Sequence, residues 1–242
     1  MKIHFIGTSH GAAEKQRKCT ATLLEIGNSL YVIDCGTSIG EYLKNADLHF
    51  SDLKGVFVTH MHADHCGCLS NLVKLFMVYD RGKNRPVFLP EEAAIESFVD
   101  WCKALHMLNP EGDVDFMKST EGCFYEDENI KVSGIKTDHI HGFDTYSYII
   151  EAEGKRILFT GDLAADIHDF PEIALSEHFD AVISELTHFA GKQTAAEVLL
   201  KTKTDHLIFN HIYPGNEKWI EGYHEQFSCP VTVTNDNDII EV

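Results

Sequence analysis

The chain has 242 residues, of which 44% are apolar and 24% are charged, and this length suits one α/β domain over residues 1–242 but not two large ones. No apolar run approaches the roughly 20 residues of a membrane-spanning helix, and the first residues lack the apolar core of a secretory signal. We therefore expect a cytoplasmic protein with no membrane segment. The formal charge of -18 argues against a protein that binds nucleic acid through its phosphates, because such proteins usually carry clusters of Lys and Arg on the binding surface.

Apolar runs rich in β-branched and aromatic residues recur along the chain, each bounded by Gly, Asp or Asn, and they predict β-strands. In chain order these runs cover residues 2–7, 20–27, 30–36, 55–60, 131–135, 146–154, 156–162, 181–186, 206–211 and 231–236.

Helical periodicity predicts amphipathic helices at residues 64–79, 91–108, 194–203 and 216–227. The acidic segment 111–129 separates the second helix from the later strands, and we expect it to form loops and a short hairpin. This succession of strands and helices predicts two sheets with helices outside them.

Seven cysteines, an odd number spread irregularly along the chain, indicate reduced thiols and not a disulfide framework. Cys66 and Cys68 stand beside a group of histidines, but cysteine is often buried without any other role. We expect these two side chains to pack in the core.

The stretch THMHADHC places three histidines and an aspartate within six consecutive positions. Alternation along an extended segment points His60 and His62 to the same side, and the turn that follows presents Asp64 and His65 to a neighbouring point. Later predicted strands end in, or lead into, residues of the same chemical kind: His139, His141, Asp162 and His211. Any one of these four alone would more often be a capping or core residue. Together with the first group they supply the imidazoles and carboxylates that zinc and similar divalent ions prefer.

With this pattern the chain resembles the metallo-β-lactamase fold superfamily, whose HxHxDH signature stands here at residues 60–65. The segments 30–36, 55–67, 141–162 and 207–211 follow in the order of the superfamily. The chain is most similar to the phosphodiesterase branch, which includes ribonuclease Z and the phosphonate-pathway cyclic phosphodiesterase. That branch has a histidine seven residues before a tyrosine, matched by His141 and Tyr148, although Ser147 replaces the usual glycine. The resemblance implies an α/β (α+β) fold built as a four-layer αββα sandwich.

The resemblance also implies two divalent metal ions, with zinc as the first expectation and manganese or iron as alternatives. The implied ligands are His60, His62 and His141 for one ion, Asp64, His65 and His211 for the other, and Asp162 as the bridge. True β-lactamases of this fold lack the bridging aspartate, so its presence speaks against antibiotic hydrolysis. The retained histidines speak against the redox role of the flavo-diiron branch.

Between the two histidines of DHIHG, the spacing to Tyr148 favours His141 as the ligand and leaves His139 outside the ligand set. A ligand histidine normally gives its second ring N–H to a carboxylate or carbonyl, and Asp34 is a candidate acceptor. The alternative for Asp34, a turn residue before Gly36, carries equal weight from the residues alone.

Three residues are candidates for catalysis. Asp64 is expected to orient the attacking water, and a protonated histidine, His188 or His139, to donate a proton to the leaving alkoxide. The stretch SELTH resembles the HEAT stretch of ribonuclease Z, whose histidine donates a proton. Here Ser184 takes that histidine's place, which leaves His188 as the substitute; the alternative for His188 is a loop histidine that faces solvent.

The reading that results is a metal-dependent hydrolase acting on a small phosphodiester, such as a cyclic nucleotide, cyclic sugar phosphate or dinucleotide. Three alternatives stay open. The first is a ribonuclease Z, which acts on tRNA and binds it with an inserted arm rich in Gly and Lys. Segment 81–130, where such an arm was considered, is acidic instead. A lactone or thioester hydrolase would use the same metals, and a metal-binding module without turnover would be expected to have lost a ligand. A homodimer is also compatible with the sequence.

Overall fold

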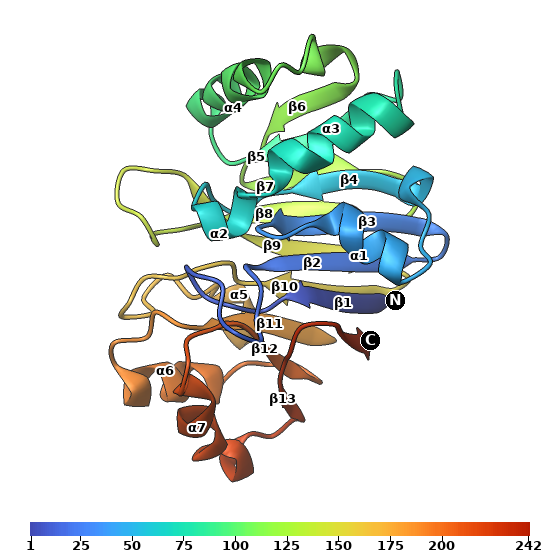
Figure 1. Ribbon diagram of the computed structural model, residues 1–242. Coiled ribbons are helices and arrows are strands. Elements are labelled where there is room, and N and C mark those ends of the chain that lie inside the picture. The colour runs from blue at the N-terminus through green and yellow to red at the C-terminus, as the bar shows by residue number, and fades with distance from the viewer.

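The computed structural model describes residues 1–242 as two seven-stranded sheets packed face to face, with helices on their outer faces (Figure 1). The first sheet has the strand order β14-β1-β2-β3-β4-β5-β6, and the second has the order β13-β12-β11-β10-β9-β8-β7. The arrangement confirms the predicted α/β (α+β) class and the four-layer αββα sandwich.

The first sheet combines an antiparallel edge with a parallel half. β1 pairs antiparallel with β2 and β14, β2 pairs antiparallel with β3, and β3 to β6 run parallel. Its strands are β1 (Lys2–Gly7), β2 (Ala21–Ile26), β3 (Ser29–Cys35), β4 (Leu53–Phe57), β5 (Arg85–Leu89), β6 (Val114–Lys118) and β14 (Asp238–Glu241). The helices of this half are α1 (Ile39–Asn45), α2 (Ala63–Cys66), α3 (Leu69–Tyr79) and α4 (Glu92–Ala104).

The second sheet repeats this division. β7 to β10 are antiparallel, whereas β10 to β13 run parallel. Its strands are β7 (Gly122–Glu126), β8 (Lys131–Thr137), β9 (Thr145–Ala152), β10 (Lys155–Phe159), β11 (Ala181–Leu186), β12 (Leu207–Ile212) and β13 (Val231–Val233). The helices α5 (Ile173–Ser176), α6 (Lys192–Leu199) and α7 (Asn216–Glu221) belong to this half.

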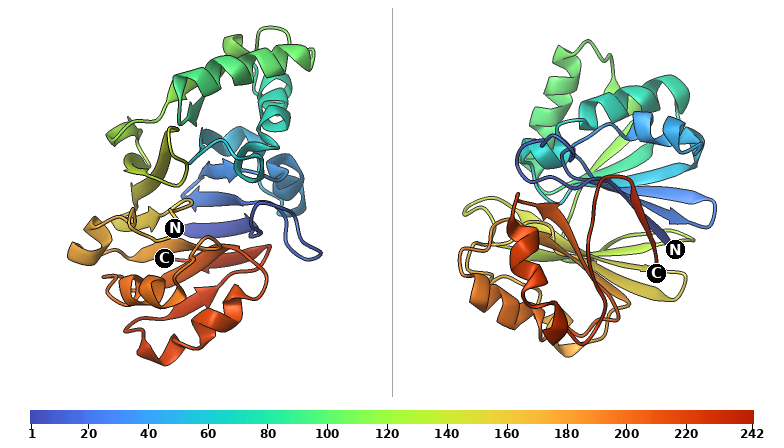
Figure 2. Two further views of the ribbon diagram at one scale, coloured as in Figure 1. Left: turned by 90° about the vertical axis from the view of Figure 1, so that its left-hand side faces the viewer. Right: turned by 60° about the horizontal axis from the view of Figure 1, so that its bottom comes forward.

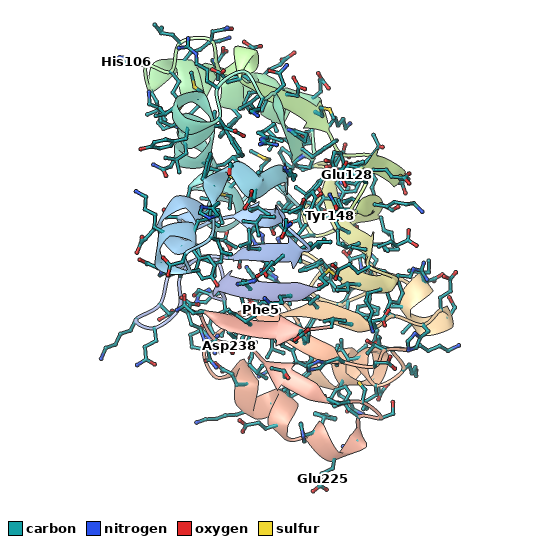
Figure 3. All side chains as sticks on the ribbon, turned by 90° about the vertical axis from the view of Figure 1, so that its right-hand side faces the viewer. Phe5, His106, Glu128, Tyr148, Glu225 and Asp238 are labelled. Carbon is teal, nitrogen blue, oxygen red and sulfur yellow. The ribbon has the colours of Figure 1, made fainter.

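Three apolar clusters fill the spaces between the four layers. One lies between the sheets and includes Phe5 and Tyr148, which Figure 3 labels. The other two lie under the helices, one below α3 and one below α6. Side chains along β1 alternate between these spaces, because Ile3 and Phe5 join the cluster between the sheets while Ile6 joins the cluster below α3.

The chain ends lie beside each other (Figure 2). The C-terminal strand β14 pairs with β1, and the amino group of Met1 donates a hydrogen bond to the carbonyl of Val242 over 3.4 Å. No helix of the chain is long and apolar enough to cross a membrane. All seven cysteines are free, and Cys66 and Cys68 pack against the cluster below α3, as the sequence predicted.

The structure corrects several predicted elements. The helix predicted over 64–79 is divided into α2 and α3, because the Cys68 N–H leaves the helical pattern and donates to the Cys35 carbonyl over 2.9 Å. The segment 111–129 does not form a hairpin: β6 lies in the first sheet and β7 in the second, so the chain crosses between the sheets here. The helices predicted over 91–108, 194–203 and 216–227 end earlier, at Ala104, Leu199 and Glu221.

Candidate metal centre

The polar residues singled out in the sequence gather where parallel strands end. The segment with His60, His62, Asp64 and His65 follows β4. Asp162 follows β10, which ends at Phe159. The carboxyl ends of parallel strands lie at one edge of a sheet, which is where open α/β sheets place their ligands. Each of the two sheets has such an edge, and the site lies where the two edges meet. His211 reaches it from within β12, and His139 from just beyond β8.

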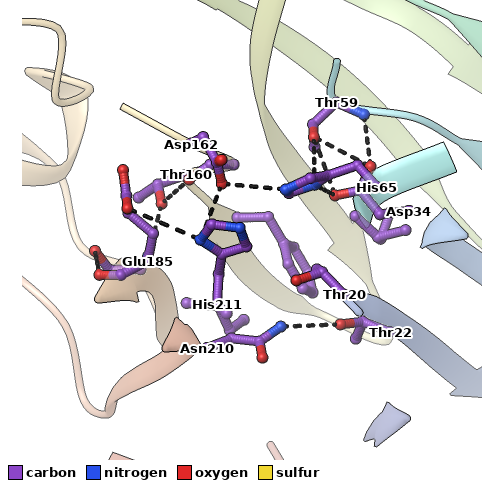
Figure 4. Close-up of a pocket in the computed structure, with 15 residues that line it drawn as sticks. Thr20, Thr22, Asp34, Thr59, His65, Thr160, Asp162, Glu185, Asn210 and His211 are labelled. Carbon is purple, nitrogen blue, oxygen red and sulfur yellow. Dashed lines mark hydrogen bonds and ion pairs between the residues drawn. The ribbon is translucent and has the colours of Figure 1, made fainter. Parts of the chain in front are cut away.

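Asp34 at the end of β3 holds the histidine segment in place (Figure 4). Its carboxylate accepts hydrogen bonds from the Thr59 N–H over 2.8 Å and from His65 Nδ1 over 2.8 Å. Asp34 has a φ of 59°, a left-handed backbone conformation that is uncommon outside glycine. His211 has a φ of 51° and is the other site residue in this region. Backbone strain of this kind costs about 1–3 kcal/mol and gathers at functional sites.

Three histidines share one orientation. Nδ1 of each donates to a protein oxygen: His65 to Asp34, His60 to Thr59 Oγ1 over 3.2 Å, and His139 to the Leu163 carbonyl over 3.1 Å. This leaves the Nε2 lone pair of each ring directed into the centre. Ligand histidines are fixed in the same way, with the outer N–H bound to an oxygen and the other nitrogen on the metal.

Asp162 stands between two groups of ligands. Its Oδ2 lies 3.6 Å from Nε2 of both His60 and His139, whereas its Oδ1 lies 3.4 Å from His65 Nε2 and from His211 Nδ1. On the second side, the Oδ2 of Asp64 lies 3.0 Å from His211 Nε2 and 3.4 Å from His65 Nε2. The two oxygens of Asp162 therefore face different clusters, as a bridging carboxylate must.

Five buried nitrogen and oxygen atoms at the centre have no hydrogen-bond partner: His60 Nε2, His65 Nε2, His139 Nε2, Asp162 Oδ1 and His211 Nδ1. A buried polar atom without a partner costs about 1–3 kcal/mol, so five in one place require an occupant. The ligand atoms of His60, His62, His139 and Asp162 lie within 4.8 Å of one another, as do those of Asp64, His65 and His211. A further group, Asp162, Glu185, His188 and His211, overlaps these two. Neutral imidazoles and carboxylates arranged in this way fit two divalent cations.

The charge states of His60, His62, Asp64 and Asp162 suit cations. Burial holds the pKa of His60 well below its usual value, and burial together with His139 lowers the pKa of His62, so both rings keep a free lone pair. Burial opposes ionisation of Asp162, but His211, His65 and His60 outweigh it and hold the pKa of this carboxyl well below its usual range. Burial also opposes ionisation of Asp64, yet the hydrogen bond from His211 and the nearby imidazole of His65 keep its pKa low. Burial opposes protonation of His65, but Asp162 and Asp34 outweigh it and hold the pKa of this imidazole well above its usual value, so a cation at Nε2 would displace a proton.

The structure corrects one choice made from the sequence. His139 joins His60, His62 and Asp162, whereas His141 is exposed and belongs to none of the groups that could hold a metal. The two histidines were expected to share a side by strand alternation, but β8 ends at Thr137, and the chain beyond it follows a turn. The structure therefore brings His139, and not His141, beside the other residues that were expected to hold a metal.

Glu185 organises the second side of the site and was not selected from the sequence. Its Oε1 accepts from the Leu163 N–H over 2.6 Å, and its Oε2 accepts from the N–H and from Nδ1 of His188 over 2.9 and 2.7 Å. Burial opposes protonation of His188, but this hydrogen bond and the charge of Glu185 raise the pKa of its imidazole to about 8. The spacing of a glutamate three residues before a histidine in SELTH is the signal that could have identified the pair.

Two glycines permit the close packing around the site. A Cβ at Gly36 would lie 1.7 Å from the Asp64 carbonyl oxygen, so only glycine lets α2 approach β3 so closely. Gly161, beside the bridging carboxylate, has a φ of 60°, and a Cβ there would lie 2.8 Å from the Tyr146 carbonyl oxygen. The Tyr148 hydroxyl donates to the Val58 carbonyl over 2.6 Å and so ties β9 to the histidine segment.

Comparison with known proteins places this chain in a family. Residues 1–199 match the family described as anti-Pycsar protein Apyc1. A ribonuclease Z from Anoxybacillus flavithermus is 28% identical over 169 residues, which cover 68% of this chain and 53% of the relative. The chain thus spans about half the length of the curated relatives it matches.

Solved structures show the same fold. The metallo-β-lactamase fold protein YhfI from Bacillus subtilis superposes with a TM-score of 0.81 at 19% identity, covering 99% of each chain. A diphosphatase from the PhnP family superposes with a TM-score of 0.71 at 14% identity, covering 100% of this chain and 97% of the other. These likenesses confirm the metallo-β-lactamase fold that the sequence predicted.

Proposed function

Because the chain belongs to the family of the anti-Pycsar protein Apyc1, we propose that it is a phosphodiesterase that uses two divalent cations to hydrolyse a small phosphodiester. The observation that carries the proposal is the set of five unpartnered nitrogen and oxygen atoms around Asp162, because its two oxygens face two separate groups of ligands. Related proteins include a ribonuclease Z and a diphosphatase, which supports chemistry at a phosphoryl group.

Zinc suits the donor set best, with manganese or iron as alternatives. His60, His62 and His139 would hold one cation, Asp64, His65 and His211 the other, and Asp162 would bridge them. Bound together, two such cations polarise the phosphoryl oxygens and make a water nucleophilic near neutral pH.

The protein's own side chains supply the remaining functions. Asp34 and the Leu163 carbonyl fix the rings of His65 and His139, so that the nitrogen atoms stay in position when substrate binds. His188 is the proton donor to the leaving alkoxide: Glu185 holds its Nδ1, which leaves Nε2 free, and 30% of the side chain is exposed. Asp64, in the group with His65 and His211, orients the attacking water.

Charge favours a small substrate over a folded RNA. The chain has 20 basic and 38 acidic residues, so a long polyanion would be repelled everywhere except close to the cations. Segment 81–130, where a basic arm was considered, forms β5, α4, β6 and β7 of the fold. A compact phosphodiester needs only the metal centre and a few neighbouring side chains.

The test is turnover of four substrates by the zinc- or manganese-loaded protein: bis(p-nitrophenyl) phosphate, a cyclic nucleotide, a precursor tRNA and a lactone. We expect hydrolysis of the first two, a loss of at least about 100-fold in His65→Ala, and poor cleavage of the tRNA at physiological salt. Efficient tRNA cleavage would contradict the small-substrate proposal and support a ribonuclease Z. Lactone hydrolysis without any phosphodiester hydrolysis would contradict the phosphodiesterase itself.

A further inference from the structure

The segment 187–189 carries His188, the proposed proton donor, and follows β11 directly. It lies outside every helix and strand, so individual side-chain contacts set its position. Glu185 holds the N–H and the imidazole of His188 and so ties them to β11. The cations, in contrast, would be held in part by His211 of β12. The distance between His188 and a phosphoryl group at the centre therefore depends on how these two strands are joined.

The pairing of these two strands is interrupted at this point. The register of β11 against β12 shifts between Glu185 and Leu186, and His211 has no paired residue in β11. His211 is thus a bulged residue with a φ of 51°, and bulges of this kind aim side chains into active sites. Its carbonyl accepts a hydrogen bond from Thr187 Oγ1. Because the backbone ladder is broken here, side chains must hold segment 187–189 beside β12.

Asn216, the first residue of α7, donates to two carbonyls next to the bulge. Its Nδ2 lies 3.0 Å from the Leu186 carbonyl oxygen and 3.4 Å from the Thr187 carbonyl oxygen. Its own N–H is bound to the Tyr213 carbonyl over 3.0 Å, so the residue is fixed at its main chain as well. The side chain is buried, where hydrogen bonds are costly to lose. One amide group thus joins segment 187–189 to the chain that follows β12.

The helix α7 also packs against the other end of this segment. The ring centroids of Trp219 in α7 and Phe189 lie 6.1 Å apart in a T-shaped arrangement, and Phe189 is buried. The Nζ of Lys192, the first residue of α6, lies 5.9 Å from the centroid of the Trp219 ring, and Figure 1 shows α7 beside α6. The helix therefore contacts the chain on both sides of His188.

We propose that Asn216 is a positioning residue for His188: its amide holds segment 187–189 so that the imidazole reaches the leaving oxygen of a substrate at the metal centre. The proposal rests on the proposed phosphodiesterase function and on His188 as its proton donor. Asn216 acts through the main chain and belongs to none of the groups that could hold a metal. A misplacement of about 1 Å can lower a rate by about 100-fold, so the loss of this amide should be measurable.

The variant Asn216→Ala removes both hydrogen bonds and leaves His188, Glu185 and the ligand residues in place. Its kcat for 3′,5′-cyclic AMP should fall by about 10- to 100-fold, because the ribose alkoxide needs a proton as it departs. Its kcat for bis(p-nitrophenyl) phosphate should change little, since p-nitrophenolate leaves as an anion, and elemental analysis should find the wild-type metal content. Asn216→Asp, which is similar in shape but lacks the amide donor, should show the same selective loss.

Asn129→Ala is the matched control. The Nδ2 of Asn129 donates to Ser29 Oγ and to the Tyr31 hydroxyl over 3.3 and 3.4 Å, next to the start of β8, whereas His139 follows the end of that strand. This variant also loses two amide hydrogen bonds, but it should keep the wild-type ratio of the two kcat values. Equal losses on both substrates in Asn216→Ala would show that Asn216 supports only the fold, and would overturn the proposal.

A double variant tests whether the two residues act together. If Asn216 acts through His188, adding Asn216→Ala to His188→Ala should cause no further loss of kcat for 3′,5′-cyclic AMP, because coupled residues are not additive. A second loss as large as that of Asn216→Ala alone would contradict a role through His188.

Hydrogen exchange separates this proposal from the phosphodiesterase function, since it needs no substrate. The His188 N–H, bound to Glu185 Oε2 over 2.9 Å, should exchange at least about tenfold faster in metal-loaded Asn216→Ala than in the wild type or in Asn129→Ala. Faster exchange in a protein that hydrolyses no phosphodiester would support the hold on the segment and contradict the phosphodiesterase function. Unchanged exchange in a protein that does hydrolyse 3′,5′-cyclic AMP would contradict the positioning role and leave the phosphodiesterase function intact.

Discussion

At the scale of single residues, the orientation of the rings decides which histidines belong to the metal centre. In His60, His65 and His139, Nδ1 is bound to an oxygen of the protein and the buried Nε2 has no partner. His141, two residues from His139, is exposed. Residue type alone does not distinguish the two histidines; the hydrogen bond at Nδ1 distinguishes the candidate ligand His139 from its neighbour His141.

These two histidines give a direct test. His139→Ala should lose one bound metal and at least about 100-fold in kcat/KM, because even the loss of an outer partner of a ligand costs about 10- to 100-fold. His141→Ala should keep both metals and change kcat/KM little. Metal content and hydrolysis of bis(p-nitrophenyl) phosphate would be measured on both variants, and the reverse result would assign the ligand to His141.

Most of the site could be predicted from the sequence, and the exceptions have physical reasons. The compact HxHxDH stretch fixes its own geometry, since four of the polar residues lie within six positions. His139 could not be chosen over His141 because the choice depends on the Leu163 carbonyl, which approaches only after β10 is in place. Glu185 escaped notice because much of its role lies in hydrogen bonds from the backbone N–H groups of Leu163 and His188, and only its bond to the His188 ring is signalled by the spacing of the two residues.

His188 can be tested through the leaving group. A ribose alkoxide needs a proton as it departs, whereas p-nitrophenolate is stable as an anion. His188→Ala should therefore lower kcat for a cyclic nucleotide by about 10²- to 10⁴-fold but affect bis(p-nitrophenyl) phosphate much less. Equal losses on both substrates would show that His188 acts by another route, such as holding the site together.

At the scale of the elements, the strands that carry ligands were predicted well and the first sheet's edge was not. The runs that became β1 to β4 and β8 to β12 are apolar and bounded by turn residues, so the local pattern suffices. β6 and β7 read as a hairpin because they are close in sequence, but a local pattern cannot show that they pair with β5 and β8 in different sheets. The helices α1 and α5 and the strands β5 and β14 were not predicted.

One carboxylate joins the two sheets and gives a pH-dependent prediction. Asp127 accepts from the hydroxyls of Tyr31 in β3 and Tyr125 in β7, over 2.7 and 2.8 Å. Burial opposes its ionisation, but the Tyr31 hydrogen bond and the other donors lower the pKa of the carboxyl. A carboxyl whose pKa is lower in the folded state stabilises the fold at pH values above its pKa in the unfolded chain, which is about 3.9. This stabilisation is lost as the pH falls through the pKa of the folded state.

Asp127→Asn should therefore lower the free energy of unfolding at pH 7, and its difference from the wild type should shrink as the pH falls below about 4. Urea unfolding of the chelator-treated proteins would measure this difference. Glu128→Gln, at the exposed neighbouring position, should show no such trend. A difference between Asp127→Asn and the wild type that stays constant from pH 7 to pH 3 would rule out the ionised carboxylate as its source.

At the scale of the whole molecule, the candidate metal centre lies where the two sheets meet, and both sheets contribute residues to it. The HxHxDH segment follows β4 of the first sheet, whereas Asp162 follows β10 and His211 lies within β12 of the second. Cations bound here would therefore join the two halves of the sandwich as well as support chemistry.

Removal of metal should consequently destabilise the fold. A ligand that binds only the folded state stabilises it by about 2.7 kcal/mol at a free concentration 100 times its Kd. We expect the Tm to fall on treatment with a chelator and to recover when zinc is added back. A variant that lacks the bridge, Asp162→Asn, should show a smaller recovery, and a Tm that is indifferent to chelator would contradict this coupling.

The most direct test of the two-cation phosphodiesterase is hydrolysis of 3′,5′-cyclic AMP as a function of zinc bound per chain. Metal-free protein would be loaded in steps, with bound zinc determined by elemental analysis and product by phosphorus NMR. Activity should rise until two zinc ions are bound per chain and then stay constant, because both groups of ligands around Asp162 must be filled. Full activity with one ion per chain, or no hydrolysis with two ions bound, would contradict the account.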